Sequence, residues 1–267
     1  MSSDVLTKTK KVDFQDLLLM AKKYKPDINV DHLCNDYFGD NILMPSLYEK
    51  WYKSIEAGKY DYSIYDDDAY LIELFHCWRK PTLRTIKDTA KIVQKFPNMF
   101  KNVRTVLDLG CGIAYTTVAL SDIFENANII GTNLYGTLQY KVCEDVCSQY
   151  DRCSMIPDSD TTKLDCSVDV ICAFEFFEHL ESPLELLSAL LTQYSPGVLL
   201  FVNSFTHMSL GHFKQYYIDG TEVTGRDVNK AFYNILKNNG YEHIETGMFW
   251  DRPQFWVKTS SIKQSLF

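Results

Sequence analysis

A glycine-rich turn between an apolar run and a helix-like stretch constrains the fold of this chain more than any other feature. The stretch "VLDLGCGIAYTT" spans Val106 to Thr117. Its first residues have the apolar character of a buried strand, and glycines follow where the chain must turn before a helix. This order predicts a strand–turn–helix unit whose turn cradles a ligand at the carboxyl end of the strand.

Short apolar runs alternate with amphipathic runs of helix length from residue 103 onward. The expected strands are 104–109, 128–132, 153–156, 168–174, 197–203, 241–247 and 254–259, and the expected helices between them are 115–124, 136–149, 183–193 and 225–239. Such alternation predicts an α/β fold with a mostly parallel sheet covered on both faces. The last two strands, joined through "MFWDRP", are expected to form an antiparallel hairpin at an edge.

The first hundred residues have a different texture, with helices separated by loops. Helical patterns run through "VDFQDLLLMAKKY", "PSLYEKWYKSIEAGKY", "YLIELFHCW" and "TLRTIKDTAKIVQKF". We therefore divide the chain into an N-terminal helical cap and substrate region at 1–100 and a ligand-binding domain at 101–267. The tyrosines at 60, 62 and 65 have two interpretations: a loop that closes over a ligand, or a seam between core and surface.

Composition limits the partners. A net charge of -8 argues against general binding to phosphate backbones, although a local basic groove stays open. No apolar run approaches the roughly 20 residues that span a bilayer, and the N-terminus has no apolar core, so we expect a soluble, cytoplasmic protein without a membrane partner. The eight cysteines lack zinc or iron–sulfur spacing, so reduced, mostly buried thiols and no metal are expected.

The residues around the glycine turn select among ligands. A P-loop is absent, because neither its glycine spacing nor its Lys-Ser/Thr is present. A dinucleotide loop needs a small residue three positions after Gly112, where Tyr115 stands. Asp108, two residues before Gly110, would repel a pyrophosphate and favour a ligand with positive charge. The sulfonium and ammonium groups of S-adenosylmethionine meet that requirement.

Three motifs in order resemble those of class I S-adenosylmethionine-dependent methyltransferases. "VLDLGCGIAYTT" resembles the family's first motif, D/E-x-G-x-G. "SVDVICAFEFFEHLESP" resembles its fourth-strand motif, and "YSPGVLLFVNS" resembles the following Pro-Gly turn and fifth strand. The resemblance covers about residues 103 to 260. It implies a Rossmann-like, seven-stranded, mostly parallel sheet with an antiparallel edge hairpin, and S-adenosylmethionine as cofactor.

The resemblance also assigns cofactor-binding positions. Asp108, Gly110 and Gly112 match the methionine-binding turn. Asn133 stands where the family usually has an acid that grips the ribose hydroxyls, so a charge-assisted bond worth about 1 kcal/mol is lost. A further set follows the next strands: Asp158 (or, less favoured, Asp160) for the adenine amino group, and Phe174 and Glu175 beside the transferable methyl.

Candidates for the chemistry follow the fourth and fifth predicted strands. His179 can take a proton from a substrate hydroxyl or amine, or, with Glu178, cap the next helix. His207 and His212 lie after the fifth strand on the ligand-facing edge. Alternatively, these two histidines belong to a solvated loop and take no part in the chemistry. The catalytic candidates are therefore His179, Glu178 and His207, with His212 comparable.

The substrate is expected to be a small molecule that is methylated on oxygen or nitrogen beneath the N-terminal cap. The fourth strand ends in "FEFF", without the Asn/Asp-Pro-Pro-aromatic signature of enzymes that methylate base amines, and no Pro-Cys nucleophile is present. Two alternatives stay open. One is a nucleotide or nucleic-acid methyltransferase with an unusual site. The other, motivated by Asn133, is a non-catalytic binding module. The oligomeric state is left open.

Overall fold

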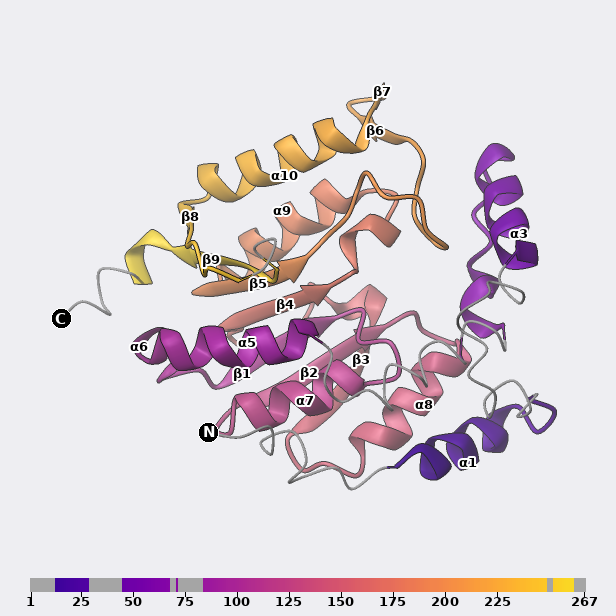
Figure 1. The fold of residues 1–267 in the computed structure, drawn as a ribbon, viewed down its shortest axis with the longest axis horizontal. Coiled ribbons are helices and arrows are strands. Elements are labelled where there is room, and N and C mark those ends of the chain that lie inside the picture. Colours follow the sequence, from indigo (N-terminus) through magenta and orange to yellow (C-terminus); the bar gives the residue numbers. More distant parts are fainter. Residues whose placement is uncertain (1–12, 29–44, 68–70, 72–83, 249–251, 262–267) are drawn as a thin grey trace.

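The computed structural model describes residues 13–28, 45–67, 71, 84–248 and 252–261. A seven-stranded sheet in the order β3-β2-β1-β4-β5-β9-β8 forms its centre (Figure 1). Strands β1 to β5 pair in parallel, whereas β9 is antiparallel to both β5 and β8. The predicted fold and edge hairpin are confirmed. The strands are β1 (Thr105–Leu109), β2 (Asn128–Asn133), β3 (Cys153–Pro157), β4 (Val170–Phe174), β5 (Val198–Val202), β8 (Tyr241–His243) and β9 (Gln254–Lys258).

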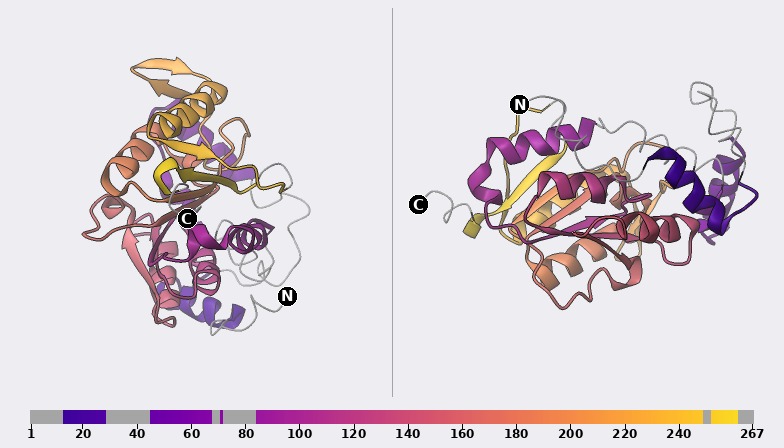
Figure 2. Two further views of the ribbon diagram at one scale, coloured as in Figure 1. Left: turned by 90° about the vertical axis from the view of Figure 1, so that its left-hand side faces the viewer. Right: turned by 90° about the horizontal axis from the view of Figure 1, so that it is seen from below.

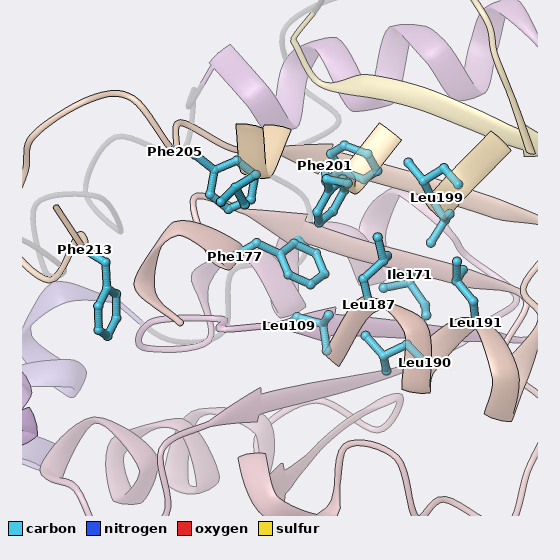
Figure 3. Close-up of a cluster of buried hydrophobic side chains, with 14 of the residues drawn as sticks. Leu109, Ile171, Phe177, Leu187, Leu190, Leu191, Leu199, Phe201, Phe205 and Phe213 are labelled. Carbon is cyan, nitrogen blue, oxygen red and sulfur yellow. The ribbon is translucent and has the colours of Figure 1, made fainter. Parts of the chain in front are cut away.

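Helices cover both faces of the sheet (Figure 2). Successive strand residues point to opposite sides, so each face carries apolar side chains that pack against the helices. Leu107 and Leu109 of β1 join the cluster beneath α9 (Pro183–Tyr194) and α10 (Gly225–Asn238), part of which is drawn in Figure 3. Val106 joins the opposite cluster, which includes residues of α5 (Arg84–Lys95), α6 (Pro97–Phe100) and α7 (Tyr115–Ile123). In the described ranges no helix is long and apolar enough to cross a membrane.

The N-terminal region is attached to α8 (Leu138–Cys147) through several contacts. Helix α1 (Phe14–Tyr24) packs beside α8, and Lys23 forms an ion pair with Asp145 at 3.1 Å. The short helix η3 (Tyr62–Asp66) bonds to the first turn of α8, where the Leu138 N–H donates to Oδ1 of Asp66 at 2.6 Å. Helix α3 (Pro45–Glu56) buries Trp51 completely. The expected helix at "YLIELFHCW" lies almost wholly outside the described residues.

Two details differ from the sequence expectation. A separate hairpin, β6 (Tyr216–Ile218) and β7 (Thr221–Val223), was not predicted, because its strands have only three residues each. Its turn residues Asp219 and Gly220 both have positive φ, and this Asp-Gly pair is the sequence signal for a tight hairpin turn. Helix α5, assigned by sequence to the N-terminal region, packs on the sheet: Ile92 joins the cluster that contains Val106.

Candidate functional site

A cavity of about 690 Å³ lies at the carboxyl ends of the parallel strands. Loops after β1, β2, β3, β4 and β5 line it, and η3 and α3 contribute tyrosines. This is the edge at which open α/β sheets bind ligands, and the volume suits a cofactor together with a small substrate. The cavity gathers most of the predicted site residues: Gly110, Gly112, Asn133, Asp158, Phe174, Glu175, His179 and His207. Asp108 and Glu178 are not among its lining residues.

The glycine turn is shaped by its neighbours. Gly110 and Gly112 have φ of +64° and +63°, a region that favours glycine. A Cβ on Gly110 would lie 2.3 Å from Cδ2 of Phe176, so the ring leaves no room for a side chain. Ala114, at the start of α7, also has a left-handed φ of +66°, and no side chain caps that helix. The N-terminus of α7, the positive end of the helix dipole, lies at this turn and suits a ligand carboxylate.

Asp108 lies beneath the turn and not in the cavity. It is 1% exposed, and its Oδ2 accepts hydrogen bonds from the hydroxyls of Thr116 at 2.6 Å and Thr117 at 2.7 Å. Burial raises the pKa of this carboxyl to about 7, although both hydroxyls act to lower it. The alternation of β1 explains the placement, because Asp108 is two residues from Val106 and so faces α7. From the sequence we expected the Asp108 carboxylate to face the ligand, whereas in the structure it lies beneath the turn and outside the cavity lining.

Asn133 connects the end of β2 to the glycine turn. Its Nδ2 donates to the carbonyl oxygen of Gly112 at 2.5 Å, and its Oδ1 accepts from the Leu134 N–H at 2.7 Å. An aspartate at this position would have no proton to donate to Gly112. The asparagine therefore holds the turn as well as lining the cavity.

Asp158 lies at the end of the cavity nearest β3. Its Oδ1 accepts from the Tyr135 N–H at 3.0 Å. Asp160, the less favoured alternative, forms an ion pair with Lys163 at 2.9 Å and does not line the cavity. Of the two acids, only Asp158 is placed to meet a ligand in the cavity.

The two glutamates after β4 have opposite environments. Glu175 lines the cavity with a half-exposed side chain at a left-handed φ of +54°, and its Oε1 lies 3.4 Å from Nη1 of Arg252. Glu178 is fully buried, and its Oε1 accepts from the Ser204 N–H at 3.0 Å. Burial, with the nearby carboxyl of Glu175, raises the pKa of Glu178 to about 9. Glu178 is therefore a neutral group behind the cavity wall that joins the β4 and β5 loops.

Histidines and a tyrosine from three distant segments of the chain meet in the cavity wall. This group, Tyr65, His179 and His212, is called the histidine end of the cavity. Nδ1 of His179 lies 3.1 Å from the hydroxyl of Tyr65, and the ring of His179 meets that of His212 edge-on, with centroids 4.6 Å apart. Burial lowers the pKa of His179 to about 3, so the imidazole is neutral. The exposed His207 accepts a hydrogen bond from His212 through its backbone carbonyl. The role of Tyr65 in this group was not predicted from the sequence, where His207 was named before His212 as a catalytic candidate.

The charged side chains that line the cavity are all acidic among the described residues. They are Asp158, Glu175 and Glu181, and no lysine or arginine accompanies them. The described part of the chain also contains no group of three His, Cys, Asp or Glu side chains placed to hold a metal ion. The cavity therefore presents a negative to neutral wall.

Comparison with known proteins gives one match to a family. A model of the methyltransferase domain matches residues 82–250. No curated protein matches the sequence. Among solved structures, the chain is similar to S-adenosylmethionine-bound CalS10, an amino pentose methyltransferase from Micromonospora echinaspora, at 13% identity and a TM-score of 0.48, covering 69% of this chain and 95% of that one.

Two other solved structures have lower TM-scores. Magnesium protoporphyrin IX methyltransferase from Synechocystis PCC 6803 is 13% identical with a TM-score of 0.47, covering 71% of this chain and 84% of that one. This chain spans about half the length of another, StiE O-MT: 48% of that chain and 55% of this one, at 16% identity and a TM-score of 0.40.

The family model covers more than half of the sequence and includes the sheet from β1 to β8 with all the loops that line the cavity between them. S-adenosylmethionine is the cofactor of this superfamily, as the motifs around Asp108 and Gly110 predicted. The chain belongs to the methyltransferase-domain family, within the class I S-adenosylmethionine-dependent superfamily.

Proposed function

We propose that this protein transfers a methyl group from S-adenosylmethionine to an oxygen or nitrogen atom of a small molecule that is uncharged or cationic. The observation that carries the proposal is the cavity itself, which joins the glycine turn to a wall of tyrosines, neutral histidines and acidic side chains. An acceptor that carries phosphates would meet repulsion there, because all the charged groups in the described lining are acids.

The residues at the glycine end fit the cofactor. The α7 N-terminus suits the carboxylate, and Glu175 supplies a negative charge near the cationic groups. In this proposal Asn133 and Asp158, which line the cavity after β2 and β3, contact the nucleoside. When bound, the cofactor supplies a methyl group that is activated by its sulfonium. Asp108 acts in this proposal through the turn, which its bonds to α7 hold in place.

Isotope transfer tests the function. The full-length protein would be incubated with methyl-labelled S-adenosylmethionine and a whole-cell extract, which is then separated into small-molecule, nucleic-acid and protein fractions. We expect label in the small-molecule fraction. Label confined to RNA, DNA or protein would reject the substrate class, and nucleic-acid binding that weakens steeply with salt would favour the nucleic-acid alternative. A calorimetric titration without affinity for either S-adenosylmethionine or S-adenosylhomocysteine would favour the non-catalytic module.

A further inference from the structure

His212 has one ring nitrogen whose protonation the structure fixes. It is 5% exposed and lines the cavity, and its Nδ1 lies 2.8 Å from the backbone carbonyl oxygen of His207. A carbonyl oxygen only accepts, so Nδ1 carries the proton. In the neutral ring the lone pair is then on Nε2. The described part of the chain offers no hydrogen-bond partner to that nitrogen.

The backbone around His212 is held on two sides. The indole N–H of Trp51, from helix α3, donates to the carbonyl oxygen of His212 at 2.9 Å. Gly211 has φ of +80°, and a Cβ there would lie 2.5 Å from Nδ1 of His179 and 2.7 Å from the hydroxyl of Tyr65. The imidazole is thus oriented before any ligand arrives, which is what a catalytic group requires.

The groups that face His212 keep it neutral. Burial lowers its pKa, and the His207 ring acts in the same direction. The carbonyl of His207 and the carboxylate of Glu175 act in the opposite direction. His179, the other ring in contact, is itself neutral. A ring in this state can receive a proton over the whole neutral pH range.

We propose that Nε2 of His212 is the general base of this enzyme and that the acceptor is a hydroxyl group of an uncharged small molecule. The inference rests on the proposed function and names the acceptor atom within it. The acceptor oxygen forms a bond to the methyl carbon while the bond from that carbon to sulfur breaks, its electron pair going to sulfur. The hydroxyl proton passes to Nε2 of His212, and the resulting imidazolium returns it to water.

His179 has a different part in this arrangement. The hydroxyl of Tyr65 can either donate to its Nδ1 or accept from it, and a backbone group of Gly211 also bonds to this ring, so its polar atoms already have partners within the protein. With a pKa of about 3, its imidazole is also a weak base. The pair of Tyr65 and His179 is therefore assigned to positioning, as the surface against which His212 packs.

Substitution of His212 by asparagine separates a base from a structural residue. The Asn side chain keeps an N–H near the place of Nδ1, which preserves the bond to His207, and removes Nε2. In the labelling assay on the small-molecule fraction, we expect His212→Asn to lower the rate about 100-fold or more, because general bases contribute that much. Its affinity for S-adenosylhomocysteine, measured by calorimetry, should stay within about twofold. Met208→Asn is the matched control, since Met208 lies in the same loop, is 48% exposed and does not line the cavity.

The pH profile adds a readout that a structural role would not change. The wild-type rate should fall in acid through a limb below pH 6.5, where His212 becomes protonated, and the residual rate of His212→Asn should lack that limb. Equal rates and equal profiles for the two proteins would overturn the proposal. So would a labelled product whose methyl carbon resonates as N-methyl instead of O-methyl.

A measurement without turnover tests the premise. Nitrogen NMR of the full-length protein should show the proton of His212 on Nδ1 at neutral pH, with His212→Asn providing the assignment. A proton on Nε2 would overturn the proposal whatever the activity. Absence of label with the wild-type protein would instead reject the proposed function, and this inference with it.

Discussion

At the glycine-turn end of the cavity, Asp108 is held by residues close to it in sequence, whereas at the histidine end the main side-chain contacts join residues that are far apart. Asp108 bonds to threonines eight and nine residues away, but Tyr65 meets His179 across 114 residues, and Trp51 meets the His212 carbonyl across 161. The first end depends mainly on backbone shape, and the second on side chains held by burial. Cofactor binding and acceptor chemistry should therefore respond to different substitutions.

The largest effect is expected at the turn. Gly110→Ala should lower the free energy of unfolding by about 3 kcal/mol, because its left-handed φ strains alanine and the added Cβ meets Phe176. Affinity for S-adenosylhomocysteine should fall at least about tenfold, since the displaced ring lies against the cavity. Urea unfolding and calorimetry measure both.

Gly58→Ala is the matched control, because Gly58 has φ of +63° and nothing within 4 Å of the added Cβ. It should cost about 1 kcal/mol, the price of the backbone conformation alone. Equal costs at the two sites would show that Phe176 moves freely and that the turn is not shaped by packing.

A smaller effect, which depends on pH, is expected behind the histidine end. The folded-state pKa of Glu178, about 9, is above its ordinary value of 4.5, so the stability due to its protonated form is complete below pH 4.5 and is lost as pH rises towards 9. Glu178→Gln does not titrate. The free energy of unfolding of Glu178→Gln should therefore rise relative to that of the wild type by on the order of 2 kcal/mol between pH 5 and pH 6.5.

Urea unfolding at each pH gives the difference between the two proteins, in which the titration of Asp108 cancels. Glu185→Gln, at an exposed position of α9, should show no such trend. A constant difference between Glu178→Gln and the wild type would mean that Glu178 is ionised in the folded protein.

The smallest effect is expected at Asn133, the position that most sharply tests whether the shape of the glycine turn controls cofactor binding. Asn133→Asp replaces the donor to the Gly112 carbonyl by a carboxylate that faces it, which should cost about 1 kcal/mol of stability and weaken the binding of S-adenosylhomocysteine. Asn128→Asp, at the exposed start of the same strand, should change neither. Tighter binding by Asn133→Asp would indicate that a carboxylate there serves the ribose at no cost to the turn.

The sequence predicted the sheet well because each strand carries its own apolar pattern. It placed Asp108 at the end of β1 but not the direction of its side chain, although Thr116 and Thr117 in the first turn of the next helix were a readable signal. The histidine end of the cavity was harder to predict from the sequence. Nothing local to residue 212 indicates a bond to His207 or an indole from helix α3, because both depend on how the loop after β5 folds back.

The bond from Trp51 to the His212 carbonyl has a practical consequence for anyone who trims the gene. A fragment cloned at the boundaries of the matched domain, residues 82–250, would omit that indole, both cavity tyrosines of η3 and strand β9, which pairs with β5 and β8 in the sheet. Such a fragment would retain the glycine turn but lose part of the opposite wall. Screening for acceptors with it would test an incomplete receptor.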